Sequence, residues 1–199
     1  MYNILTGSVK MSSIFGALLI SVNPEILSPW EKITKRIVDV LLSILAILIL
    51  LPVFILLSFL IKTGSKGPII FKQKRIGLYG NPFWIFKFRS MITEAEKDGP
   101  QLSSQNDPRI TAIGKFMRKT RLDETPQFFN VIKGDMAIVG PRPEREYYIE
   151  KIVEKAPHYK HVLKVKPGIT SWGQIKFGYA ENVDEMIARL KFAVSYTHL

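Results

Sequence analysis

The strongest pattern in the chain is an apolar run over residues 40–61, which contains no charged side chain and is interrupted only by Ser43, Pro52 and Ser58. As a helix, a run of this length is sufficient to cross a hydrocarbon core of about 30 Å. Basic residues flank both ends, with Lys32, Lys35 and Arg36 before the run and Lys62, Lys66, Lys72, Lys74 and Arg75 after it. Because lysine and arginine are enriched on the cytoplasmic side of membrane segments, both flanks are expected in the cytoplasm. A straight spanning helix does not allow that arrangement.

Pro52 lies just past the middle of this apolar run. A proline inside a helix removes one backbone donor and clashes with the carbonyl group four residues earlier, so we expect a kink there. Each half then has about 10–14 residues, a length typical of re-entrant or interfacial segments. The pattern therefore favours a re-entrant hairpin over residues 31–62 above a simple spanning helix. Asp39, at the entry of the run, is expected to pair with Lys35 or Arg36 at the depth of the membrane interface.

The pattern changes downstream of the apolar run. Two β-prone runs, at residues 69–71 and 83–88, flank a stretch at residues 77–82 that is rich in glycine, asparagine and proline. This arrangement predicts a small β-hairpin. The rest of the chain is expected to be mainly helical.

Two further helices are indicated by their apolar spacing. Ile113, Phe116 and Met117 recur at helical spacing among basic residues, which predicts an amphipathic helix. That helix either lies on an anionic membrane surface or packs on the core with a solvated basic face. Asn182 is expected to begin another helix near the C-terminal end. Upstream, residues 14–22 are apolar but short, and we interpret them as a connector.

Composition narrows the choice of partners. The 199 residues carry a formal net charge of +11, and the isoelectric point is near 9.8. Anionic lipid headgroups and phosphorylated substrates are the natural partners of such a surface. Nucleic acid is disfavoured, because the basic residues are spread among apolar strings instead of forming a tail or one helical stripe. The chain has no cysteine, which excludes disulfides and thiolate metal sites and suits the reducing cytoplasm.

Two adjacent carboxylates, Asp123 and Glu124, follow the basic side chains of Arg118, Lys119 and Arg121. One interpretation is structural, since acidic residues favour the first turn of a helix. The other is chemical, since phosphoryl transfer from a diphosphate needs a nucleophile, a divalent cation and positive groups. A carboxylate can attack phosphorus, a second one can hold Mg²⁺, and nearby arginines keep the first one ionised. The two interpretations are compatible.

Two other strings offer cations. Pro141 and Pro143 clamp Arg142 in a stiff, extended loop, and the planar fork of arginine suits a phosphate or a base. The alternative is a rigid turn without further role. Lys87 and Arg89 end the expected hairpin among apolar neighbours, but a half-exposed strand with surface cations has the same pattern.

Several motifs stand in a fixed order along the chain: Lys35-Arg36 with Asp39, Ser65-Lys66-Gly67-Pro68, Gln73 with Arg75 and Gly77, Lys87-Phe88-Arg89-Ser90-Met91, Asn106-Asp107-Pro108-Arg109-Ile110-Thr111, Leu122-Asp123-Glu124, Pro126-Gln127, Asn130-Val131, Gly134-Asp135-Met136 and Val139-Gly140-Pro141-Arg142-Pro143-Glu144. Together, over residues 32–174, they resemble the bacterial sugar transferase family of monotopic phosphoglycosyl transferases. The number of ordered motifs makes the resemblance highly specific.

The resemblance implies a mainly α fold with a small β-hairpin. Residues 31–62 would form a re-entrant membrane helix broken at Pro52. Residues 63–192 would form a compact catalytic domain on the membrane surface, at the cytoplasmic face of a bacterial inner membrane. Residues 1–30 would be a linker, or the remnant of an upstream region of a larger member, and residues 193–199 would be an atypical, truncated tail.

The resemblance also implies roles for individual residues. Asp123 would be the nucleophile, forming a covalent sugar-phosphate intermediate with release of UMP, and Glu124 together with Asp123 would hold Mg²⁺. Arg118 and Lys87 would serve the phosphates. The further substrate-binding residues would be Arg89, Gln127, Pro141, Arg142 and Pro143, the last three at the uridine end.

The implied partners are a UDP-sugar donor, undecaprenyl phosphate or another polyprenyl phosphate as acceptor, and anionic membrane lipids, with no nucleic acid. A homo-oligomer remains open. The reaction would be the first membrane step in building an exopolysaccharide, a capsule, an O-antigen or a glycoprotein glycan. The alternatives are a membrane-anchored binding module, which has no use for the acidic pair, and an ordinary glycosyl transferase, which releases UDP instead of UMP. Convergence of Asp123, Glu124, Arg118, Lys87 and Arg142 in one pocket would favour the enzyme.

Overall fold

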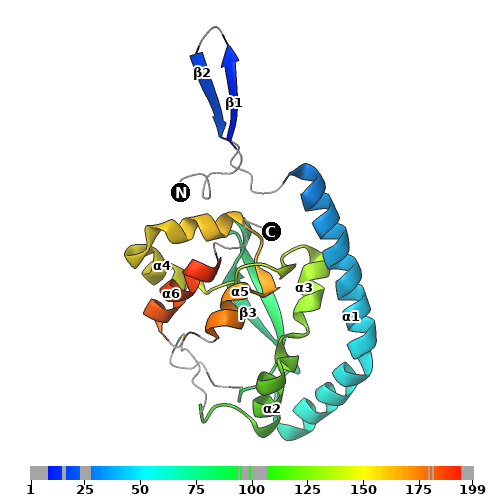
Figure 1. Cartoon of the computed structure of the whole chain (residues 1–199). Helices are drawn as coiled ribbons and strands as arrows, with labels where there is room; N and C mark the ends of the chain where they lie inside the picture. The colour runs from blue at the N-terminus through cyan, green and yellow to red at the C-terminus, as the bar shows by residue number, and fades with distance from the viewer. Residues whose placement is uncertain are drawn as a thin grey trace.

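The computed structural model describes residues 9–14, 17–22, 28–93, 95, 99, 107–178, 180 and 182–193. The helices are α1 (Pro29–Gly64), α2 (Ala112–Thr120), α3 (Gln127–Lys133), α4 (Glu146–Lys155), α5 (Trp172–Phe177) and α6 (Val183–Ala193). The 3₁₀ segments are η2 (Leu78–Gly80), η3 (Leu122–Glu124) and η4 (Pro157–Lys164). The strands are β1 (Val9–Ile14), β2 (Ala17–Val22), β3 (Ile70–Ile76), β4 (Pro82–Phe88), β5 (Ala137–Val139) and β6 (Gly168–Thr170). The mainly α fold with a small hairpin is confirmed (Figure 1).

The strands form two-stranded sheets. β3 and β4 pair antiparallel, from Ile70 with Phe88 to Ile76 with Pro82, so the hairpin expected from the sequence is present. β5 and β6 pair in parallel. Residues 14–22, interpreted as a connector, instead contain β2, which pairs antiparallel with β1.

Helix α1 extends over 36 residues, and at a rise of 1.5 Å per residue it is about 54 Å long. It is one continuous helix through Pro52, so two separate half-helices are not present, although the helix bends part-way along its length (Figure 1). A proline removes a single donor from the ladder, and Val53, Phe54 and Leu57 pack the following turns against the core, which holds them helical. The helix curves around the domain instead of breaking (Figure 1).

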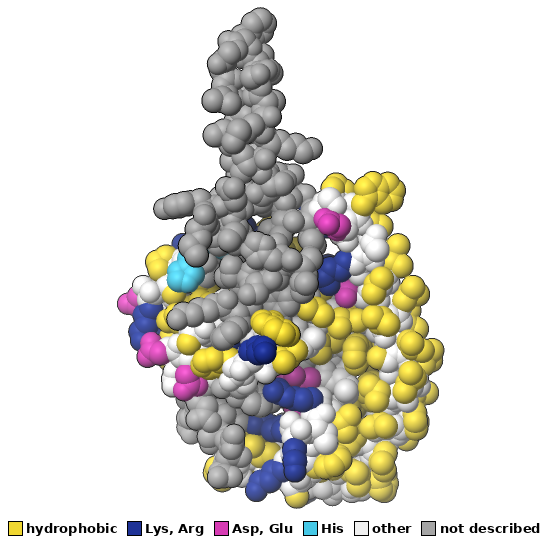
Figure 2. Space-filling view, viewed as in Figure 1, with side chains coloured by type: hydrophobic (Ala, Val, Ile, Leu, Met, Phe, Trp, Pro, Cys, Tyr) yellow, Lys and Arg dark blue, Asp and Glu magenta, His cyan; other side chains and the backbone are white. Residues whose placement is uncertain are grey.

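Most of α1 is an exposed apolar surface. By length and composition the helix is able to cross a membrane. Side chains such as Leu48, Ile49 and Phe59 are each more than 60% exposed. Figure 2 shows hydrophobic side chains along the right edge of the molecule, where α1 runs in Figure 1. A surface of this kind requires a cover other than water.

The N-terminal half of α1 is attached to the domain by polar contacts. Lys35 and Asp39 form the expected ion pair at 2.8 Å, and the other oxygen of Asp39 accepts a hydrogen bond from the backbone of Ile138 at 3.3 Å. Arg36 has a different role from the one considered, because it donates to the carbonyl groups of residues 131 and 132 at 2.5 and 2.8 Å. These carbonyl groups lie in the last turn of α3. Helix α1 therefore holds the end of the helix that follows the acidic pair.

The C-terminal half of α1 is attached by apolar packing. Leu57 and Ile61 share a buried cluster with Phe88 of β4 and Met117 of α2. Only part of the apolar side expected for α2 packs on the core. Met117 is fully buried, whereas its neighbour Phe116 is 54% exposed. Both halves of α1 thus pack on the same domain.

The C-terminal helices form a separate core. Met186 and Leu190 of α6 pack against α4 and η4 in one buried cluster. Asn182 accepts a hydrogen bond from the backbone of Glu185 at 2.8 Å, which confirms the helix start expected at this asparagine. Side chains of this core line a small cavity together with Pro141 and Arg142.

Candidate active site

The acidic pair lies on η3, a single 3₁₀ turn between α2 and α3. Arg121 ends α2 with a left-handed backbone (φ 59°), so the chain changes direction one residue before η3. Both Asp123 and Glu124 are buried, with 6% exposed. Neither side chain caps α3, whose cap position is Pro126 and has no side-chain cap bond. The helix-capping interpretation of the pair is therefore not supported by the geometry.

Glu124 is held by cations from three different segments. Its Oε1 accepts from Lys87 Nζ of β4 at 2.8 Å and from Arg142 Nη1 at 3.2 Å. Its Oε2 lies 3.7 Å from Arg121 Nη1. Burial alone raises the pKa of Glu124, but Lys87 and Arg142 outweigh it and lower that pKa far below its ordinary value. Burial also lowers the pKa of Lys87, against the opposing charge of Glu124. Glu124 is thus a permanent anion at the centre of the site.

Asp123 has the opposite character. Burial raises the pKa of its carboxyl group and Glu124 adds to the rise, while Lys87, Arg118 and Arg142 oppose it. Its Oδ1 is buried and has no hydrogen-bond partner within the described part of the chain. Buried carboxylate oxygens are nearly always satisfied, so an open one at a cationic site is ready for an incoming group.

Arg118 is positioned from the end of β4. Its Nε donates to the hydroxyl group of Ser90 at 3.0 Å, and Ser90 is itself buried. The carbonyl group of Ser90 accepts from the backbone of Thr111, which begins α2. The sequence offered Ser90 as part of a motif but gave no reason for its role. The hydroxyl group fixes a guanidinium whose charge acts on Asp123.

The loop of Pro141, Arg142 and Pro143 is extended and tightly held, as expected. The carbonyl group of Pro141 accepts from Gly168 at 2.9 Å, and that of Pro143 accepts from Arg75 at 3.1 Å. Two prolines and two such anchors leave Arg142 little freedom. The loop therefore holds Arg142 in place for its contact with Glu124.

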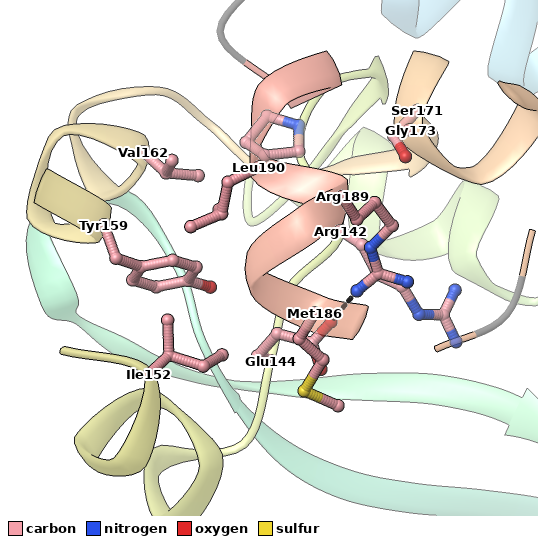
Figure 3. Close-up of a pocket in the computed structure, with 11 residues that line it drawn as sticks. Arg142, Glu144, Ile152, Tyr159, Val162, Ser171, Gly173, Met186, Arg189 and Leu190 are labelled. Atoms are coloured by element: carbon pink, nitrogen blue, oxygen red, sulfur yellow. Dashed lines mark hydrogen bonds and ion pairs between the residues drawn. The ribbon is translucent and has the colours of Figure 1, made fainter. Parts of the chain in front are cut away.

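A second buried carboxylate, Glu144, was not expected as a functional centre. Arg189 of α6 donates to its Oε1 at 2.6 Å, and Arg75 lies 3.4 Å from its Oε2. Burial lowers the pKa of Arg75 to about 10, although Glu144 opposes the change. Figure 3 shows Glu144 and Arg189 joined beside a cavity of about 20 Å³ that Tyr159 and other apolar side chains line. We call Arg75, Glu144 and Arg189 the Glu144 cluster.

One sequence signal pointed to the Glu144 cluster. Arg189 lies three residues after Met186 and directly before Leu190, on the side of α6 that packs inward. An arginine on the apolar side of a helix needs a buried acidic partner. The pattern does not identify the acidic partner, because Glu144 lies 45 residues earlier in the chain.

Arg89 and Gln127, both expected to bind substrate, differ in how the protein uses their side chains. Arg89 donates through Nη2 to the carbonyl group of Ser65 at 2.8 Å and through Nη1 to that of Lys66 at 3.0 Å, which closes the end of α1, while its buried Nε has no partner within the described residues. The substrate-binding role expected of Arg89 stays a prediction. Gln127 begins α3 and is 2% exposed, and its Nε2 has no hydrogen-bond partner within the described residues. It stays a candidate.

Two carboxylates of this site are the candidates to hold a divalent cation. Among the described residues, no three histidine, cysteine, aspartate or glutamate side chains lie close enough together to hold a metal ion. Mg²⁺, however, often uses one or two carboxylates and completes its shell with water and substrate oxygens. Oε2 of Glu124, with its long contact to Arg121, and the open carboxylate of Asp123 supply such a set.

The comparisons with known proteins agree with this geometry. The model of the family described as Bacterial sugar transferase matches residues 30–198. The chain belongs to the bacterial sugar transferase family. Of the five residues expected to converge, Glu124 contacts Lys87 and Arg142 directly, and the charges of Lys87, Arg118 and Arg142 lower the pKa of the adjacent Asp123 against the effect of burial.

Individual bacterial sugar transferases are similar over nearly the whole chain. The UDP-N-acetylgalactosamine-undecaprenyl-phosphate N-acetylgalactosaminephosphotransferase of Aeromonas hydrophila is 39% identical over 192 residues, which is 96% of this chain and 45% of that protein. The UDP-glucose:undecaprenyl-phosphate glucose-1-phosphate transferase of Escherichia coli (strain K12) is 38% identical over 198 residues, 98% of this chain and 42% of that protein. A transferase of the same name from Caulobacter vibrioides is 36% identical over 166 residues, 81% of this chain and 61% of that protein. The chain thus spans less than half of the length of the first two.

Proposed function

We propose that this bacterial sugar transferase moves a sugar 1-phosphate from a UDP-sugar to undecaprenyl phosphate and releases UMP. The observation that carries the proposal is the open Oδ1 of Asp123, a buried nucleophile-type atom among cations. Relatives with high coverage of the chain are named for transfers of this kind. A binding module would gain nothing from an unsatisfied buried carboxylate.

The reaction proceeds in two displacements on one phosphorus atom. In the first, Oδ1 of Asp123 bonds to the β-phosphorus of the donor, and the bond from that phosphorus to the oxygen bridging to the α-phosphate breaks. UMP leaves with both electrons and the bridging oxygen. In the second, an oxygen of the lipid phosphate attacks the same phosphorus and the Asp123 carboxylate departs. Neither step needs a proton, so the charges balance without an acid or a base.

The cations around the pair act on the charges that develop. The bond that breaks leaves new negative charge on UMP, and preorganised cations in a buried site stabilise such charge strongly. Lys87 and Arg142 approach from the Glu124 side, and Arg118 from the end of β4. Glu124 keeps these cations together when the donor is absent.

Mg²⁺ belongs to this proposal as well. Glu124 and Asp123 would hold it, through oxygens that the protein does not fully use. A bound Mg²⁺ would neutralise part of the charge of the donor diphosphate. The shell would be completed by water and phosphate oxygens.

We also propose that α1 enters and leaves the cytoplasmic leaflet of the bacterial inner membrane. Both halves of α1 pack on the same domain, the first through Arg36 and Asp39 and the second through Leu57 and Ile61. If the domain stays in water, a straight span would separate one half from it. The curved course of α1 supports a re-entrant position with the exposed apolar side in lipid (Figure 1).

The topology is tested with single cysteines at Lys32 and Lys66, since the chain has no cysteine of its own. Both should react with a membrane-impermeant thiol reagent from the cytoplasmic side. Labelling of the two sites from opposite sides would contradict the re-entrant position. It would leave the chemistry of the acidic pair unaffected.

The reaction is tested by product analysis with the full-length protein in membranes. UDP-glucose and UDP-N-acetylgalactosamine are supplied with undecaprenyl phosphate, and the released nucleotide is identified. We expect UMP with at least one donor. UDP as the product would indicate ordinary glycosyl transfer, and no nucleotide from a broad panel of donors would indicate a binding module.

A further inference from the structure

Two buried polar atoms near the start of α3 lack a partner. One is Oδ1 of Asp123 and the other is Nε2 of Gln127, four residues later. The first is an acceptor and the second is a donor. The backbone between them stays right-handed helical through Thr125 and Pro126. This stretch is held by 3₁₀-type hydrogen bonds, so Gln127 starts about 8 Å along the helix axis from Asp123 and about a third of a turn around it. One short, rigid piece of chain thus carries both open atoms, and the long side chain of Gln127 can approach the position in front of Asp123.

Gln127 differs from the other buried amide of the same helix. Asn130, one turn later, is fully buried and uses both ends of its side chain. Its Oδ1 accepts from the backbone of Phe86 at 3.0 Å, and its Nδ2 donates to the carbonyl group of Trp84 at 2.7 Å. Asn130 therefore acts as an additional strand residue beside β4. The fold satisfies one amide completely and leaves the other open.

An open buried donor reduces stability unless another molecule supplies the acceptor. The position next to Asp123 indicates what that acceptor is. Whatever bonds to Oδ1 of Asp123 must present electron-poor phosphorus to that atom, and it carries electron-rich oxygens around the phosphorus. A neutral amide donor can bind such an oxygen without adding a charge to a site that Lys87 and Arg142 already make cationic.

We propose that Gln127 is a catalytic residue whose Nε2 donates a hydrogen bond to a non-bridging oxygen of the phosphoryl group that Asp123 receives and passes on. The inference rests on the proposed function and names an atom that acts in both displacements. Negative charge on the equatorial oxygens is redistributed in the transition state of phosphoryl transfer. The hydrogen bond strengthens there, so it lowers the barrier more than it tightens donor binding.

The test compares Gln127→Met with Asn130→Leu in the full-length protein. Methionine has a similar length and no donor, and it replaces an unsatisfied polar group with an apolar one, which is neutral or stabilising. The melting temperature of Gln127→Met should equal or exceed that of the wild type. The rate of UMP release should fall by about 100-fold, as for the loss of one transition-state donor. KM for the donor should change little, because the loss is in kcat.

Asn130→Leu supplies the matched control, because its amide is satisfied by the protein. Its melting temperature should fall clearly. If Gln127→Met also melts at a clearly lower temperature, the amide has a structural partner and the inference is overturned. UMP release within about threefold of the wild type would overturn it as well.

The same experiment separates the inference from the proposed function. A wild-type protein that releases no UMP with any donor sinks both. A wild-type protein that releases UMP while Gln127→Met retains its kcat sinks the inference alone. Gln127→Glu, which keeps the shape and replaces the donor with an anion, should lose at least as much activity as Gln127→Met, and full activity of this variant would also overturn the role.

Discussion

The acidic pair and the Glu144 cluster are alike in burial and charge but differ in completeness. Glu144 is 5% exposed, and each of its oxygens faces a guanidinium, Oε1 that of Arg189 and Oε2 that of Arg75. At the acidic pair, both oxygens of Glu124 also face cations, although Arg121 lies 3.7 Å from Oε2, whereas Asp123 keeps an open Oδ1. The fold therefore completes its buried ion pairs where they hold the structure together. It leaves one carboxylate incomplete at the position where the proposed reaction has a substrate bond.

The largest expected effect is on chemistry at the incomplete carboxylate. Asp123→Asn keeps the shape but removes the nucleophile, and it should reduce turnover by about 10³-fold or more. Stability should hold or rise, because an unsatisfied buried carboxyl group is replaced by a neutral one. The measurement is the UMP burst and the radioactive adduct in acid-quenched protein, after mixing with labelled donor and no acceptor.

Glu150→Gln is the control for Asp123→Asn, because Glu150 is an exposed carboxylate on α4. It should retain both the burst and the adduct. An adduct on a residue other than Asp123, or full turnover without any adduct, would rule out the covalent route. Direct attack by the lipid phosphate would then replace it.

The next effect is on stability at the complete carboxylate. Glu144→Gln leaves Arg75 and Arg189 buried without their common anion, and loss of one partner from a buried ion pair costs about 3–5 kcal/mol. The control is Glu146→Gln, since Glu146 is 65% exposed and lies 3.8 Å from Lys74. Exposed pairs contribute about 0–1 kcal/mol. Melting temperatures that fall equally in both variants would remove the distinction between the two regions.

The comparison of the acidic pair with the Glu144 cluster also shows which buried charges could be predicted from the sequence. The residues that meet at Glu124 had been singled out from the sequence, the acidic pair and Arg142 by their local motifs and Lys87 by the family resemblance. The Glu144 cluster joins β3, a loop and α6, and no local pattern reports a contact between segments so distant in the chain. Sequence patterns identify reactive side chains better than they identify the pairing of buried charges.

Two other residues, Arg89 and Pro52, lie in contacts that the sequence did not predict. Arg89 was expected to bind substrate, and in the structure two of its nitrogens donate to the carbonyl groups at the end of α1. Pro52 suggested a broken helix, but one lost hydrogen bond is outweighed when the following turns are packed. Both cases depend on tertiary contacts, which residue type alone does not report.

A smaller effect is expected on donor recognition. Arg142→Lys preserves the charge that faces Glu124 but loses the planar fork and one possible second hydrogen bond. KM for the UDP-sugar should rise about tenfold, roughly the value of one hydrogen bond to a charged group. KM for undecaprenyl phosphate is the internal control and should stay constant. A change confined to the acceptor would move Arg142 from the donor side to the lipid side.

The smallest effect is a displacement along the pH axis, and it separates the two neighbouring carboxylates. Asp123 must be ionised to attack, and burial raises its pKa, so kcat/KM should decline on the acid side at a pH above the usual range of aspartate. Glu124 adds no decline there, because its pKa is far below the ordinary value.

The direction for stability follows from the same raised pKa of Asp123. The folded protein holds this proton more tightly than the unfolded chain, so the contribution to stability is present at low pH and is lost as pH rises through the folded pKa. Asp123→Asn should therefore stabilise the protein more at neutral than at acidic pH. Lys87→Met removes a cation that opposes the rise, and it should move the acid limb of the residual activity to higher pH. A limb that stays in place would mean that a group other than Asp123 titrates, and it would end the contrast between the raised pKa of Asp123 and the lowered pKa of Glu124.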